Sequence, residues 1–75
     1  MELNPKEKTA FLRGIGDRVE KLIYQKYKSK DQFIRETGFH KRPLHDVLMG
    51  NRDTHVSMIL KLAKALDVKP KDLIP

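Results

Sequence analysis

The sequence contains no cysteine, so it can form neither disulfide bonds nor cysteine-ligated metal sites. A chain without cysteine suits a reducing compartment better than secretion, and we expect a cytoplasmic protein. Long hydrophobic runs are also absent. The runs present are far shorter than the about 20 residues of a transmembrane helix, and no signal-like apolar stretch opens the chain. A membrane protein is therefore not expected.

The residue patterns that catalysis requires are equally scarce. The chain shows no paired carboxylates, no nucleophile beside a base and no phosphate-binding glycine loop. With 75 residues it forms one domain, which leaves little room for a concave pocket. His40 and His45 lie on different sides of the predicted helix and His55 lies in another segment, so no metal-ligand spacing is present. We expect a protein that is not an enzyme, with no cofactor, metal or small-molecule ligand.

Positive charge is what the sequence has in excess. Sixteen Lys and Arg stand against ten Asp and Glu, which gives a formal net charge of +6. On so small a surface, this balance favours a polyanionic partner. Composition alone does not distinguish nucleic acid from other polyanions, and the arrangement of the charges must decide.

The pattern of apolar residues predicts an all-α protein, because no stretch alternates apolar and polar residues as a half-buried strand does. Asn4 and Pro5 form a good helix start, which predicts a helix over residues 5–13. Gly14 and Gly16 each cost about 1 kcal/mol relative to alanine within a helix, so we expect a break or bend there.

Two further helices follow from the spacing of apolar residues. A stripe of Val19, Leu22, Ile23 and Tyr27 predicts a helix that ends near Lys26. The second of these helices is short and lies between Ser29 and Gly38.

Ser29 supplies the N-cap of that short helix, and Gln32 is placed to close a capping box. Phe33 and Ile34 anchor the helix in the core. Gly38 is expected to end it as a left-handed C-cap.

The helix at about 41–48 carries two different faces. Its apolar residues Leu44, Val47 and Leu48 fall on one side, and its basic residues fall on the other. With the cap at His40, Pro43 lies in the first turn, where no intrahelical acceptor is lost. The proline is therefore compatible with the helix.

A fourth helix is predicted from Thr54 or His55, with a last helical turn opened by Lys69 and Pro70. The residues of the fourth helix expected to point inward are Val56, Ile59, Leu60, Ala63 and Leu66. The last turn is expected to hold Leu73 and Ile74. Two interpretations stay open for Met58, Leu62, Leu73 and Ile74, which are either core residues or part of a two-fold interface. Two short helices joined at a glycine, the second with a basic outer face, form a helix-turn-helix.

The run "SKDQFIRETGFHKRPLHDVLMGNRDTHVSMILKLAKALDVKPKDLI" resembles the Cro/repressor-type helix-turn-helix family, often called Xre-like. The resemblance covers about residues 15–74. Residues 1–14 lie outside it and are predicted to be a helical N-terminal extension of a domain at residues 15–75, serving as an arm on DNA, an added dimer contact or a simple extension of the fold. It depends on the Ile15-Gly16 opening, the Ser29 cap, the Gly38 turn, the Gly50-Asn51-Arg52 loop and the segment "LKLAKALDV". The resemblance implies a five-helix, phage-repressor-like fold.

The same resemblance implies a sequence-specific transcriptional regulator, a repressor or an activator, that binds a palindromic operator on double-stranded DNA as a homodimer. The helix at about 41–48 would then lie in the major groove. Base contacts are implied for Lys41, Arg42, His45 and His40. Backbone contacts are implied for Ser29, Lys30, Asn51 and Arg52. Arg42 best suits the paired acceptors of guanine, because its planar fork meets two acceptors at once.

One rival interpretation stays open at this point. The same fold can serve as an antitoxin-like or adaptor domain whose main partner is a protein. Two departures from the family pattern concern the docking pose of the helix at about 41–48 and not the choice of partner: Ile34 stands where the family usually has a small residue, and Pro43 is unusual so early in that helix. The basic reader positions favour DNA over the rival, whereas binding that fell little with salt would favour the rival.

Overall fold

The computed structural model of the chain describes residues 4–51 and 53–75. Within these residues all regular structure is helical, as the sequence predicts. The elements are α1 (Pro5–Lys26), α2 (Lys30–Thr37), α3 (Lys41–Met49), α4 (Val56–Leu66) and the 3-10 turn η1 (Pro70–Leu73).

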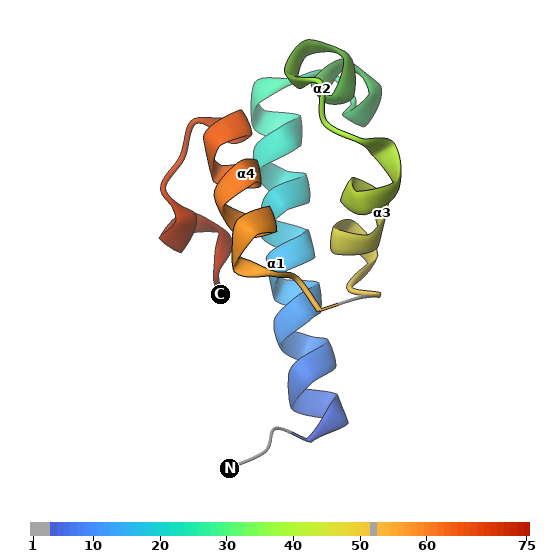
Figure 1. Ribbon diagram of the computed structural model, residues 1–75, viewed down its shortest axis with the longest axis vertical. Helices are drawn as coiled ribbons and strands as arrows, with labels where there is room; N and C mark the ends of the chain where they lie inside the picture. Colours follow the sequence, from blue (N-terminus) through green and yellow to red (C-terminus); the bar gives the residue numbers. More distant parts are fainter. Residues whose placement is uncertain (1–3, 52) are drawn as a thin grey trace.

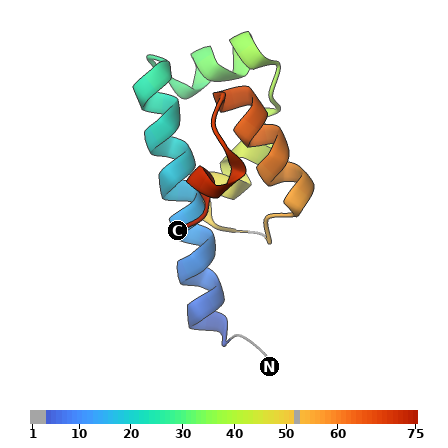
Figure 2. The same ribbon diagram turned by 90° about the vertical axis from the view of Figure 1, so that its left-hand side faces the viewer.

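The long helix α1 is the centre of the arrangement. Figure 1 shows α4 in front of α1 at the left, α3 at the right and α2 across the upper end of α1, and Figure 2 shows that α3 and α4 lie on the same side of α1. Figure 2, turned by 90°, shows η1 and the C-terminal segment returning to the middle of α1. The first turns of α1 extend beyond the other helices, and the molecule measures 40 × 22 × 20 Å.

The start of α1 follows the sequence prediction, but its expected interruption is wrong. The Asn4 side chain accepts a hydrogen bond of 2.8 Å from the Glu7 N–H, and Pro5 occupies the first turn. The helix then continues without a break through Gly14 and Gly16 to its end. The predicted N-terminal extension is therefore part of α1 rather than a separate helix, and the division into residues 1–14 and 15–75 stays a prediction.

Tertiary packing explains why Gly16 lies within a helix. A Cβ atom at Gly16 would lie 2.6 Å from the carbonyl oxygen of Val47 and 2.7 Å from that of Leu48. The missing side chain thus allows α1 and the end of α3 to approach closely. The glycine that predicted a break is instead a packing position.

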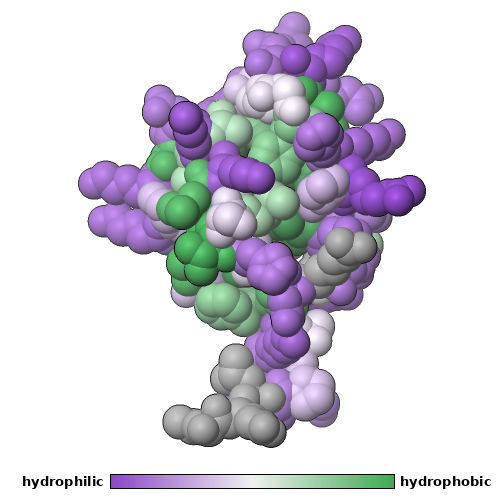
Figure 3. Space-filling model, viewed as in Figure 1, coloured by the Kyte–Doolittle hydropathy of each residue, from purple (hydrophilic) through white to green (hydrophobic). Residues whose placement is uncertain are grey.

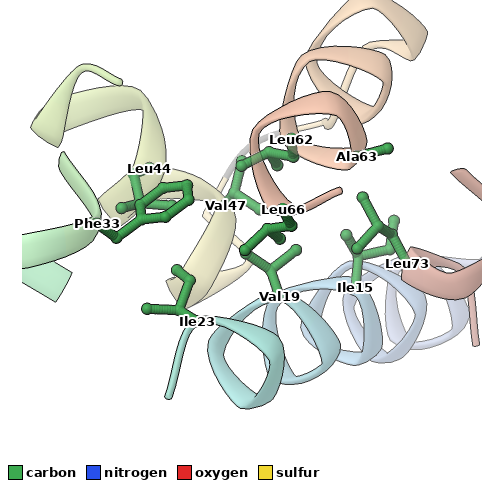
Figure 4. Close-up of a cluster of buried hydrophobic side chains, with 10 residues drawn as sticks. All are labelled: Ile15, Val19, Ile23, Phe33, Leu44, Val47, Leu62, Ala63, Leu66 and Leu73. Atoms are coloured by element: carbon green, nitrogen blue, oxygen red, sulfur yellow. The ribbon is translucent and has the colours of Figure 1, made fainter. Parts of the chain in front are cut away.

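The core is a single cluster of apolar side chains contributed by all five elements (Figure 4). Phe33 of α2 is completely buried and contacts two other rings, Tyr27 at 5.3 Å and Phe39 at 5.9 Å between ring centres. The buried apolar residues are Ile15, Val19, Ile23, Phe33, Leu44, Val47, Leu62, Ala63, Leu66 and Leu73. This cluster fixes α2 and α3 on α1.

The predicted inner face of α4 is wrong at two positions. Val56 is 71% exposed and Leu60 is 52% exposed, whereas Leu62 is completely buried. Because α4 is apolar at most of its positions, several different stripes satisfy helical periodicity equally well. Packing against α1 and η1 selects the stripe that contains Leu62 and Leu66.

The last turn follows the prediction only in part. Pro70 opens η1 and Leu73 is buried, but Ile74 lies 40% exposed. Ile74 is the C-cap residue that follows η1, so it lies outside the turn on extended backbone. The resemblance implies a five-helix fold, and residues 4–51 and 53–75 form four α-helices and, in fifth place, this single 3-10 turn.

Candidate nucleic-acid interface

Helices α2 and α3 form the helix-turn-helix unit, and a three-residue turn joins them. Gly38 begins the turn with φ 73°, in the left-handed region that favours glycine, and its N–H donates to the Ile34 carbonyl oxygen at 2.9 Å. His40 then precedes the first residue of α3, as predicted. The glycine thus ends α2 and sets the direction of α3.

Helix α3 divides into a buried and a basic face, as its sequence predicts. Leu44 and Val47 are buried in the core. The basic residues of the same helix are all exposed; they are Lys41, Arg42 and His45. Because the helix directs these two sets to different sides, the basic side chains point away from the protein and are accessible to a partner.

The first turn of α3 combines positive charges with the positive end of a helix. Its first two residues are Lys41 and Arg42, its first turn contains no acidic residue, and His40 makes no side-chain capping hydrogen bond. The helix macrodipole disfavours cations at this end by about 0.3–1 kcal/mol each. An anion that binds here relieves the repulsion, so the local electrostatics favour a negatively charged partner.

Lys30 of α2 lies on the same surface as the basic face of α3. Lys30, Lys41 and His45 border one shallow hollow between the two helices. Ile34 and Leu44 are among the apolar residues beneath it. The bulky Ile34 is accommodated between α2 and α3, so a backbone-contact candidate and two base-contact candidates share one face.

Ser29 caps α2 as predicted and keeps a donor for another partner. Its Oγ accepts a 3.1 Å hydrogen bond from the Gln32 N–H, which leaves the hydroxyl hydrogen to donate. The predicted capping box is wrong in one detail. The Gln32 side chain accepts from the Lys28 N–H at 2.6 Å, one residue before the cap, and not from the N–H of the cap residue Ser29.

The loop after α3 carries the remaining backbone candidates. Gly50 ends α3 with φ 67°, and the Asn51 N–H donates to the Asp46 carbonyl oxygen at 3.1 Å. The exposed Asn51 therefore has its backbone engaged in the helix end and its side chain at the surface. Arg52 lies outside the described residues.

The structure adds cations of α1 to this loop, and sequence reasoning missed them. A Cβ atom at Gly50 would lie 3.0 Å from Cγ of Arg13, so α1 packs directly beneath the loop. The Lys8 ammonium also forms a 2.8 Å ion pair with Asp53. No local pattern reports these contacts, because they join segments about 40 residues apart in the sequence.

Neither a metal centre nor a membrane helix is found in the described part of the chain. No group of three or more His, Cys, Asp or Glu side chains gathers there in a way that could hold a metal ion. No helix of residues 4–51 and 53–75 is long and apolar enough to cross a membrane.

Comparison with known proteins gives one informative match. Neither protein-family models nor curated proteins match the chain. Among solved structures it is similar to the restriction-modification controller protein C.AhdI from Aeromonas hydrophila, with a TM-score of 0.72 and 32% sequence identity. The similarity covers 84% of this chain and 96% of C.AhdI.

Proposed function

Because the chain belongs to the Xre-like helix-turn-helix family of DNA-binding transcriptional regulators, which are not enzymes, we propose that α3 reads a specific operator from the major groove. The observation that carries this proposal is the exposed basic face of α3, opposite its buried apolar face. A major groove about 12 Å wide admits one helix and presents a distinct pattern of donors and acceptors for each base pair. The exposed first turn of α3 suits that site.

Base recognition in this proposal belongs to four side chains at the start of α3. Arg42 donates two hydrogen bonds to N7 and O6 of one guanine, which is the contact that its planar guanidinium fits best. Lys41 acts as a point charge on a base or a phosphate. His45 and His40 contact the edges of bases that neighbour those met by Lys41 and Arg42.

Backbone contacts position the reader helix without reading sequence. Lys30 borders the same hollow as Lys41 and can contact a phosphate beside the groove. The Ser29 hydroxyl donates to a phosphate oxygen while its Oγ continues to cap α2. Asn51 contributes its side-chain amide from the loop after α3, and Arg52 contributes a guanidinium.

A homodimer on a palindromic operator completes the proposal. Two copies place half-site centres about 34 Å apart, one turn of the double helix. Val56 and Leu60 lie four residues apart on α4 and are largely exposed, so they form an apolar face that a second copy would cover. The likeness to C.AhdI makes promoters of restriction-modification genes the first operators to examine.

Selection of bound sequences from a random duplex pool tests specificity and symmetry together. We expect a palindrome whose half-sites are one helical turn apart. A pool that stays random, or binding that changes little between low and high salt, would instead favour a protein-binding module of the same fold.

Two substitutions test the assignment of roles on the selected operator. Arg42→Ala is expected to cost about 1–3 kcal/mol of binding free energy and to relax preference at one base pair. The matched change Lys30→Ala is expected to weaken all duplexes alike and to reduce the salt slope by about 1. Titration by fluorescence anisotropy at several salt concentrations measures both effects. Equal losses on specific and random duplexes for both variants would contradict the roles.

A further inference from the structure

An open groove lies between α4 and the turn that joins α2 to α3. Its volume is about 540 Å³, within the range of about 300–1,000 Å³ that is typical of small-molecule sites. Figure 3 looks onto this face and shows pale hydrophobic side chains bordered by purple hydrophilic ones. The groove is separate from the hollow between α2 and α3 described above, and the two share no lining residue.

The groove is mainly apolar, and its shape is fixed by the core. Its apolar lining includes Phe39, Pro43, Met58 and Ala65. Phe39 is held by its contact with the buried ring of Phe33, and Met58 packs against the core from α4. A ligand with an aromatic or aliphatic body would replace water on this surface, which is favourable in proportion to the apolar area covered.

Cations border the same groove. Lys61 and Lys64 of α4 line it and are exposed, and their spacing of three residues places them on neighbouring positions of one helix face. Within residues 4–51 and 53–75, neither ammonium forms an ion pair with a carboxylate. The ion pair found in this part of the chain, between Lys8 and Asp53, lies outside the groove. His40, on the opposite wall, can add an N–H donor.

We propose that this groove binds a small amphiphilic anion. The apolar body covers Phe39, Met58 and Ala65, and the anionic group lies against Lys61 and Lys64. The charges and the apolar lining are complementary to these two parts of such a molecule. This inference does not depend on DNA binding, so either proposal can fail while the other holds.

A pair of probes that differ in charge tests the proposal directly. The anion is 8-anilino-1-naphthalenesulfonate, and its uncharged counterpart is N-phenyl-1-naphthylamine, which lacks the sulfonate. Amide chemical shifts of the 15N-labelled protein locate the site, and fluorescence titration gives the affinities. We expect saturable shifts at Gly38, Phe39, Lys61 and Ala65, with several-fold tighter binding of the sulfonate.

Two double variants of equal net charge separate local contacts from the overall field. Lys61→Ala with Lys64→Ala is expected to weaken sulfonate binding about fivefold, while leaving the uncharged probe unchanged, because two partly solvated ion pairs are lost. Lys21→Ala with Lys71→Ala removes two exposed lysines that do not line the groove, and a change below about twofold is expected. Circular dichroism of both variants serves as the control that their helices are retained.

Three results would overturn the proposal. The first is no saturable binding of the sulfonate up to millimolar concentration. The second is equal binding of both probes by the unmodified protein, which would show an apolar surface without anion recognition. The third is chemical-shift change centred on Val56 and Leu60 instead of the groove.

Discussion

At the scale of single residues, the two glycines of α1 have different consequences. A side chain at Gly16 would meet the carbonyl oxygens of Val47 and Leu48, which belong to the backbone of α3 and cannot move alone. At Gly14 the added atom would lie 2.7 Å from the side chain of Pro75, which is exposed and outside the helices. Both positions are glycine in the sequence, but only Gly16 faces a backbone that cannot move aside, whereas Gly14 faces a side chain that can shift.

Gly16→Ala is expected to destabilise the fold by about 1–3 kcal/mol, because the cost of overpacking exceeds the helix propensity that alanine adds. Gly14→Ala is the matched control. It is expected to be neutral or to stabilise by up to about 1 kcal/mol, since Pro75 can shift. Urea unfolding followed by circular dichroism measures both. Equal stabilities of the two variants would refute the close packing of α1 on α3.

At the scale of elements, Lys26 joins the ends of two helices. Its ammonium, in the last turn of α1, donates to the carbonyl oxygen of Leu66, the last residue of α4. The last carbonyl groups of a helix have no intrahelical donor, and the negative end of the macrodipole favours a cation. The contact thus fixes α4 on α1 beside the buried side chain of Leu66.

Lys26→Met should lower the free energy of unfolding by about 1 kcal/mol, since the methionine keeps the aliphatic packing but loses the charged donor. For a domain of this size the loss corresponds to a fall in Tm of about 4–8 °C. Thermal unfolding followed by circular dichroism measures it. Lys21→Met, at an exposed position of the same helix, should change Tm little, and a similar fall in both variants would argue against the contact.

At the scale of the whole molecule, the apolar face of α4 formed by Val56 and Leu60 is the surface proposed above for the contact between two copies. A palindromic operator needs two copies of the reader helix in a fixed relation. Side chains exposed as far as 71% and 52% contribute little to the monomer's core, so they can be changed without loss of the fold. This separates the effect on assembly from the effect on stability.

Val56→Glu combined with Leu60→Glu is expected to give a folded monomer that keeps weak half-site binding and loses the tighter binding of the full palindrome. Two carboxylates would oppose their symmetry mates across a two-fold contact. Sedimentation velocity and gel shifts on full and half operators test this, with Ser57→Glu on the exposed side of α4 as control. An unmodified protein that stays monomeric with and without DNA would remove the basis of the prediction.

Local patterns in the sequence determined the class of fold and the location of α3, the helix proposed to read DNA. The caps at Asn4 and Ser29, the turn at Gly38 and the two faces of α3 depend on short-range rules, and the structure confirms them. Similarity to C.AhdI independently confirms the helix-turn-helix family. The contact roles of individual residues remain predictions, because recognition depends on a partner as well as on the chain.

The tertiary structure alone decided what Gly16 does, which stripe of α4 is buried and that Lys8 and Arg13 lie against the loop after α3. Each of these features joins segments far apart in the sequence. Helical periodicity states only that one face is buried, whereas the shapes of the neighbouring helices determine which face it is. The groove bordered by Lys61 and Lys64 arises in the same way, because no single segment contains both of its walls.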